Sequence, residues 1–234
     1  MYRDLSQPIE TGMQTFPDDP AVCLQPAATV DEDGYRVTKL HLGTHTGTHI
    51  DAPAHLIPDG DSLDAFPVER FVFEARVVDC TEFGLREPIP ASALPADDDG
   101  DMVVCRTGWD AHWGTDRYLD HPYLSPGAAG RCVEAGWSVG LDTLNPDPTP
   151  NPDVVDTGSD GEPEGFPVHR ALLGNGLFIV ENLTNLAGLD RFRLFAFPLA
   201  TVDADGSPVR AVARTGRFGA MSDVEEFRES RRNP

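Results

Sequence analysis

The segment HLGTHTGTHIDAPAHL, residues His41–Leu56, holds four of the seven histidines of this 234-residue chain. Gly43 and Gly47 are poor helix formers, and the threonines around them are β-branched. Pro53 biases the residue before it towards an extended conformation. The segment is therefore predicted to be the end of a strand followed by a turn, although the spacing of His45 and His49 would also suit one turn of a helix.

The same segment predicts a metal site. Side chains alternate along an extended chain, so His49 and Asp51 are expected to point to one side. A bend at the glycines would bring His45 to them, and His55 follows the turn at Pro53. Imidazole and carboxylate are ligands of zinc, manganese or iron, and a carboxylate can bridge two ions. A divalent metal is favoured over the alternative that these histidines are satisfied by the backbone.

Outside this segment the pattern is that of an α/β protein with more sheet than helix. Ser125 and Pro126 predict a helix that ends at Gly136, and a short helix is expected from Pro167 to Gly174. A hairpin is expected within Thr29–Lys39, and a terminal helix within Asp223–Ser230. Strands are predicted at Val72–Cys80, Met102–Arg106, Ser138–Leu141, Leu177–Val180, Phe192–Phe197 and Val209–Ala213. No linker interrupts the chain, so residues 1–234 are interpreted as a single mixed-sheet domain.

One stretch reads as a long loop. Residues Asp142–Gly165 are rich in proline and acidic residues and almost free of apolar side chains. Structureless loops of this length are uncommon inside compact domains and are usually functional or disordered. The loop is interpreted either as a border or lid of the active site or as a solvated insertion, with equal weight.

Composition excludes several classes of protein. The formal net charge is −21, with one lysine, Lys39, so nucleic-acid binding is excluded. The excess of aspartate favours adaptation to high salt, which would screen the self-repulsion. No apolar run is long enough for a membrane span, and no signal pattern opens the chain, so a cytoplasmic protein is expected. The four scattered cysteines are expected to be small apolar side chains rather than disulfides or zinc ligands.

The motif HTGTHIDAPAH, His45–His55, resembles the signature of the metal-dependent cyclase and kynurenine formamidase (arylformamidase) family. The resemblance covers most of the chain. Four further stretches match in order: Asp4–Pro20, RTGW at Arg106–Trp109, GLDT at Gly140–Thr143 and ENLTNL at Glu181–Leu186. The resemblance implies the swivelling β/β/α fold of that family and a homo-oligomer, a dimer or larger.

The resemblance also implies a role for each site residue. His45, His49 and Asp51 would hold one divalent ion, zinc or manganese. Asp51 would reach a second ion, which His169 would bind and Glu181 would share, giving one or two ions per subunit. His55 would be the catalytic acid/base. In addition, Phe16 stands where formamidases of this type place a tryptophan that lines the substrate pocket, while His41, His112 and His121 match no family role and are interpreted as structural.

The implied reaction is hydrolysis of a small-molecule amide. A metal-bound hydroxide would attack the carbonyl, and His55 would protonate the departing amine. The reaction that fits best is N-formylkynurenine to kynurenine and formate. The alternatives are another cyclic or aryl amide, as in an isatin-hydrolase-like enzyme, and a non-catalytic metal-binding protein. His55 argues against the last, because a purely structural site is closed by its ligands.

Overall fold

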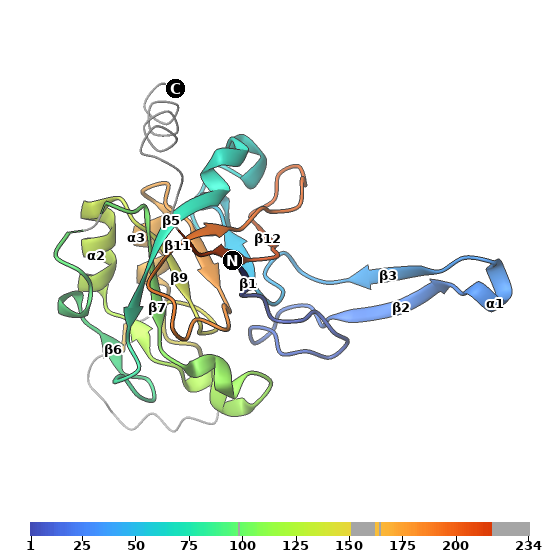
Figure 1. The fold of residues 1–234 in the computed structure, drawn as a ribbon, viewed down its shortest axis with the longest axis horizontal. Helices are drawn as coiled ribbons and strands as arrows, with labels where there is room; N and C mark the ends of the chain where they lie inside the picture. Colours follow the sequence, from blue (N-terminus) through green and yellow to red (C-terminus); the bar gives the residue numbers. More distant parts are fainter. Residues whose placement is uncertain (98, 151–161, 164, 217–234) are drawn as a thin grey trace.

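The computed structural model describes residues 1–97, 99–150, 162–163 and 165–216. Its elements alternate strands with few helices, which confirms the predicted mixed α/β class (Figure 1). The strands are β1 Tyr2–Asp4, β2 Cys23–Ala28, β3 Val37–His41, β4 His49–Asp51, β5 Val72–Asp79, β6 Pro88–Ile89, β7 Met102–Arg106, β8 Tyr123–Leu124, β9 Ser138–Leu141, β10 Ile179–Glu181, β11 Arg191–Phe195, β12 Gly206–Pro208 and β13 Val212–Arg214. The α-helices are α1 Val30–Asp33, α2 Pro126–Ala135 and α3 Pro167–Leu173. Short 3₁₀ turns cover η1 Pro53–His55, η2 Leu63–Ala65, η3 Val68–Phe71, η4 Ala91–Ala93, η5 Trp109–His112 and η6 Asp116–Asp120.

One nine-stranded mixed sheet organises these elements, in the order β1-β13-β11-β5-β7-β9-β10-β4-β12. Strands β5, β7, β9 and β10 are parallel neighbours, and every other pairing in the sheet is antiparallel. Strand β4, which contains His49 and Asp51 of the histidine segment, lies between β10 and β12. This pairing brings residues near positions 180 and 207 next to the histidine segment.

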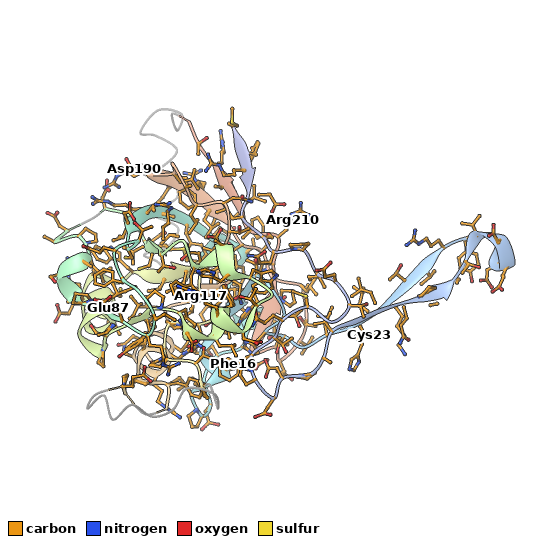
Figure 2. All side chains as sticks on the ribbon, turned by 90° about the horizontal axis from the view of Figure 1, so that it is seen from below. Phe16, Cys23, Glu87, Arg117, Asp190 and Arg210 are labelled. Atoms are coloured by element: carbon orange, nitrogen blue, oxygen red, sulfur yellow. The ribbon has the colours of Figure 1, made fainter. Side chains whose placement is uncertain are left out.

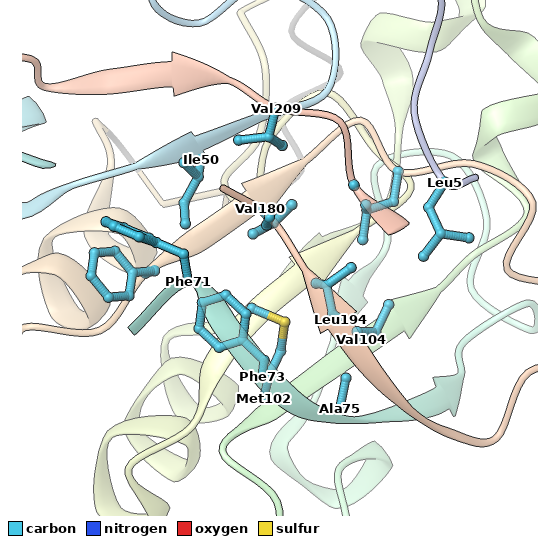
Figure 3. Packing of buried hydrophobic residues seen from close by; sticks show 14 of the residues in the cluster. Leu5, Ile50, Phe71, Phe73, Ala75, Met102, Val104, Val180, Leu194 and Val209 are labelled. Atoms are coloured by element: carbon cyan, nitrogen blue, oxygen red, sulfur yellow. The ribbon is translucent and has the colours of Figure 1, made fainter. Parts of the chain in front are cut away.

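Alternation along the central strands separates two apolar cores. Met102 and Val104 of β7 belong to one core, and Val103 and Cys105 of the same strand belong to the other. The first core is built from strands and loops, as Figure 3 shows for a close-packed group that includes Ile50. The second is covered by α2 and α3, which pack on the same face of the sheet (Figure 1).

Both helices have the ends that the sequence predicts. The hydroxyl of Ser125 accepts the backbone N–H of Ala128 at the start of α2, and Gly136 ends this helix with φ of 73°. A residue with a Cβ is strained at that φ, which is why a glycine stands there. Pro167 opens α3 at a position where its missing N–H costs nothing.

Strands β2 and β3 form an arm that projects away from the sheet (Figure 1). Cys23, at the start of β2, lies where the arm leaves the body (Figure 2). The predicted hairpin within Thr29–Lys39 is confirmed but underestimated, because pairing extends from Cys23 to His41. Thr29 caps the single helical turn α1 at its tip.

The predicted strand Val209–Ala213 is wrong in its bounds. The chain instead forms β12 up to Pro208 and β13 from Val212. Strand β12 is one edge of the sheet, and β13 lies next to β1, the strand at the other edge. A continuous strand cannot pair with both β4 and β11, so the backbone leaves the sheet at Val209 and re-enters it at Val212. The terminal helix predicted within Asp223–Ser230 lies outside the described residues.

All four cysteines are free, and three of them are buried, as expected for small apolar side chains. In the described parts of the chain, no helix is long and apolar enough to cross a membrane.

Candidate metal centre

Two neighbouring strands, β4 and β10, place three of the candidate ligands. Strands β4 and β10 run antiparallel with His49 opposite Glu181 and Asp51 opposite Ile179. Ile50 and Val180 point into the strand-built core. Because side chains alternate, His49, Asp51 and Glu181 face the other side of the sheet, where α3 lies. All three side chains are buried.

Helix α3 delivers His169 to the same place. The carboxylate of Asp147, from the acidic loop, accepts the backbone N–H groups of Val168 and His169 at the start of the helix. It also accepts the Nδ1–H of the His169 ring at 2.7 Å. Asp147 therefore fixes both the helix end and the orientation of the ring, so that Nε2 faces Glu181 and Asp51.

His45 reaches the group because the chain turns at Gly47, whose φ is 61°. Its Nδ1 lies 2.8 Å from Oδ1 of Asp51. Its other nitrogen, Nε2, lies 2.9 Å from the carboxylate of Asp205. Gly206 leaves room for the ring, since a Cβ at that position would lie only 2.6 Å from Cε1 of His45.

Each of the three imidazoles thus has one nitrogen held by an acceptor and the other turned inward. Nδ1 of His49 lies 2.9 Å from the carbonyl of Gly47, which can only accept, so His49 donates there. Its Nε2 then lies 3.2 Å from Oε2 of Glu181 and 3.3 Å from Oδ1 of Asp51. Inward-facing ring nitrogens and carboxylate oxygens therefore face each other, an arrangement that either a proton on the ring or a metal ion between the groups satisfies.

Two buried oxygens bear on this choice. Oδ2 of Asp51 and Oε1 of Glu181 have no hydrogen-bond partner in the described part of the chain. Nε2 of His169 comes within 3.2 Å of Oε1 of Glu181, but the direction does not suit a hydrogen bond. Leaving a buried carboxylate oxygen unsatisfied is costly. Divalent metal ligation would satisfy both oxygens, so the residues fit the ion.

Candidate ligand atoms form three overlapping groups within the described residues. Those of His45, His49 and Asp51 lie within 4.8 Å of one another, as do those of Asp51, His169 and Glu181 and those of His45, His55 and Asp205. The first two groups bring together the five ligands expected from the sequence, with Asp51 common to both. This geometry can hold one or two ions.

The electrostatics agree with a centre that attracts positive charge. Burial alone would lower the pKa of His45, but hydrogen bonds to Asp205 and Asp51 outweigh it and raise the pKa to about 9. Burial would also lower the pKa of His169, yet Asp147 and Glu181 raise it to about 10. Burial would raise the pKa of Asp51, but the histidines hold it well below its usual range. The carboxylates therefore favour either protons or a metal ion on these rings.

His55 differs from the inner histidines. It ends the turn η1, and its ring centroid lies 4.0 Å from that of His45. Its side chain is 28% exposed, whereas His49 is 3% exposed and His169 is 5% exposed. Nδ1 of His55 lies 3.4 Å from the same Asp205 carboxylate that holds His45. His55 therefore stands at the edge of the centre, open to a bound molecule.

A pocket opens above the centre. Phe16, Leu56, Leu144 and Phe166 give it apolar walls, and the inner residues together with His55 form its floor. The ring of Phe16 packs in a small cluster with Trp109, Tyr118 and Leu144 and lies 6.2 Å from the ring of Phe166. Phe16 thus lines this pocket, and its contact with substrate stays a prediction. The described start of the acidic loop borders it through Leu144 and Asn145.

Known proteins resemble this chain in sequence and in fold. The model of the Cyclase family matches residues 3–148. A kynurenine formamidase from Bacillus cereus is 32% identical over 218 residues, which cover 90% of this chain and 96% of that protein. The chain belongs to the Cyclase family. It is therefore a metal-dependent hydrolase, as the sequence predicted.

Solved structures of cyclase-family enzymes have the same fold. An isatin hydrolase bound to the product analogue thioisatinate has a TM-score of 0.78 at 24% identity, over 92% of each chain. Isatin hydrolase A from Labrenzia aggregata has a TM-score of 0.76 at 24% identity, over 91% of this chain and 93% of that one. At such identities the likeness concerns the fold alone.

The remaining histidines of this cyclase-family chain lie outside the pocket. His41 is exposed on the arm, and His112 stacks edge-on against Trp109 at 4.9 Å. His121 is buried elsewhere, between the carbonyl of Pro122 and the hydroxyl of Thr149. None of the three lines the pocket, and their interpretation as structural residues stays a prediction.

Sequence reasoning missed two carboxylates that hold the rings. Asp205 lies just before β12, in the stretch DADGSP, and Asp147 lies in the acidic loop. Each carboxylate lies far in the sequence from the histidine that it contacts. Asp205 reaches His45 because β12 pairs with β4, and Asp147 reaches His169 at the start of α3. Two weak sequence signals could have indicated them. Asp205 precedes a glycine, Gly206, and Asp147 lies in the loop that was interpreted as a possible border of the active site.

Proposed function

We propose that the protein hydrolyses an aryl formamide, of which N-formylkynurenine, giving kynurenine and formate, is the best candidate. The observation that carries this is that imidazole nitrogens and two carboxylate oxygens without hydrogen-bond partners converge among the residues that line an apolar-walled pocket. The 32% identity to a kynurenine formamidase over 90% of the chain supports the same substrate class.

Under this proposal His45, His49, Asp51, His169 and Glu181 hold the divalent metal, zinc or manganese. When bound, the ion supplies Lewis acidity, polarising an amide carbonyl and lowering the pKa of a coordinated water. Asp205, Asp147 and the carbonyl of Gly47 fix the ring orientations of the three histidines. The aryl ring would lie against Phe16, Leu144 and Phe166, where burial of apolar surface favours it over water.

His55 is proposed as the proton donor to the leaving amine. An anilide nitrogen leaves poorly unless it is protonated, and His55 is the histidine of the floor that is most open to a bound molecule. Its Nδ1 faces Asp205, which leaves Nε2 free to exchange a proton with substrate. Asp205 would thus serve two rings, one that holds metal and one that moves a proton.

A cyclic amide such as isatin is the second candidate. It is favoured by the likeness to isatin hydrolases, but that likeness concerns only the fold. Both substrates would place an aryl amide carbonyl at the same centre, so the site geometry does not distinguish them. Their rates of hydrolysis by the same protein have to be compared.

The test is hydrolysis by the purified, metal-loaded protein. We expect N-formylkynurenine to be hydrolysed with kcat/KM at least roughly tenfold above that for isatin, and chelation to abolish both reactions. Kynurenine formation and isatin ring opening are followed by absorbance. Faster isatin opening would favour the second candidate, and no turnover of either amide would favour a non-catalytic metal-binding protein.

Replacement of Asp205 tests the shared carboxylate. Asp205→Asn keeps the shape but loses the charge that His45 and His55 contact, so kcat should fall by about 10- to 100-fold. Asp203→Asn is the matched control, since Asp203 is exposed two residues away with φ of 56°, which asparagine tolerates. Equal activity of the two variants would refute a role for Asp205.

We also propose a homo-oligomer, a dimer or larger. The protruding arm carries exposed apolar side chains, Val30, Tyr35, Val37 and Leu40, which a second copy could cover. The acidic composition supports function at high salt, and the unpaired cysteines support a reducing, cytoplasmic location.

A further inference from the structure

Part of the pocket wall, called the rim from here on, comes from Gln14, Thr15, Phe16 and Asp19. The side chain of Gln14 donates to the carbonyl of Thr115 at 3.1 Å and accepts the N–H of Gly114 at 3.0 Å. The rim is thus tied at one end to the loop between η5 and η6. It is an anchored rim rather than a free loop.

A tight turn continues from this anchor. The N–H of Asp19 donates to the carbonyl of Phe16 at 3.1 Å, and Asp18 within the turn has φ of 72°. The Phe16 side chain is held in the cluster around Trp109. The turn brings both Phe16 and Asp19 to the pocket wall, whereas Asp18 is not part of that wall. Both aspartates are exposed to solvent.

The pocket wall carries a negative charge and no positive one among its described residues. Apart from the metal centre and His55, Asp19 is the one ionisable residue among the described residues that line the pocket. No lysine or arginine lines it there, and the sequence of the bordering loop, residues 142–165, contains neither. A substrate carboxylate therefore finds no cationic partner on this wall, whereas a substrate cation finds a carboxylate.

Asp19 is available for such a contact. Within the described residues its carboxylate makes no direct hydrogen bond or ion pair. It lies close enough to the floor to interact electrostatically with His45, His49 and His55. A molecule bound over the floor would displace water around Asp19, and removal of water strengthens attraction to an opposite charge.

We propose that Asp19 selects substrates that carry an ammonium group. On the proposed function, from which this inference starts, the pocket would prefer an aryl formamide with an α-amino group on its side chain to one without it. The ammonium would meet Asp19 at the rim, and an accompanying carboxylate would face solvent. A neutral cyclic amide would gain nothing from Asp19.

The test compares two substrates that differ only in the amino group: N-formyl-L-kynurenine and 4-(2-formamidophenyl)-4-oxobutanoate. The wild type is expected to prefer the first. In Asp19→Asn the ratio of the two kcat/KM values should fall about fivefold, the scale of a partly exposed ion pair, mainly through KM. Asp18→Asn removes the same charge one residue away and should leave the ratio unchanged.

Three outcomes are informative. A ratio that falls in Asp19→Asn but not in Asp18→Asn supports the inference. An unchanged ratio in Asp19→Asn, with both formamides still hydrolysed, overturns the role of Asp19 and leaves the proposed function intact. If the wild type hydrolyses neither formamide, the proposed function fails, and the inference fails with it.

Discussion

Hydrolysis of the aryl formamide is expected to fall by on the order of 10³-fold or more in Asp51→Asn, together with the metal content. Asp51 belongs to both groups that contain the five proposed ligands, and its two oxygens point to different histidines. Asparagine keeps the shape but loses the charge, so the proposed metal site would lose its central anionic ligand. Elemental analysis and turnover are measured on the same preparation.

Asp31→Asn is the control for loss of one acidic charge, because Asp31 is exposed at the tip of the arm. Circular dichroism establishes that both variants are folded. Full metal content in Asp51→Asn would show that Asp51 is not a ligand. Loss of metal with turnover intact would show that hydrolysis does not depend on the ion.

The second large effect is expected at His55. His55→Ala should lower kcat by about 100-fold or more while the metal content remains that of the wild type, because the variant removes the proposed general acid and keeps the proposed ligands. The contrast with Asp51→Asn separates a proton donor from a ligand. The readouts are again metal stoichiometry and turnover.

His41→Ala removes an exposed histidine of the arm and should change neither readout. The alternative is that His55 binds metal, because the ligand atoms of His45, His55 and Asp205 also lie within 4.8 Å of one another. Loss of metal in His55→Ala would make His55 a ligand. Unchanged turnover would remove the acid/base role.

Local chemistry made the histidine segment predictable. Glycine, threonine and proline around His45 and His49 disfavour a helix, and the segment indeed forms β4 and the turn η1. The alternation of an extended chain puts His49 and Asp51 on one face, and their side chains lie 3.3 Å apart. Helix α2 is equally local, because Ser125, Pro126 and Gly136 define its ends.

The distant partners could not be derived in this way. His169 and Glu181 were expected only through the family resemblance, since each has an ordinary structural explanation by itself. Asp205 and Asp147 were missed, and Val209–Ala213 was assigned to one strand. Each case depends on which strands become neighbours, and that is not encoded in a short window of sequence.

By itself, then, the sequence determined the extended histidine segment, the ligand types and the helix ends, because these depend on backbone preferences and on periodicity. The tertiary structure alone decided that His49 stands opposite Glu181, 132 residues later, and that Asp205 holds both His45 and His55. The physical reason is that strand register is fixed by packing one apolar face of the sheet. Burial of Ile50 and Val180 turns their polar neighbours together towards the other face.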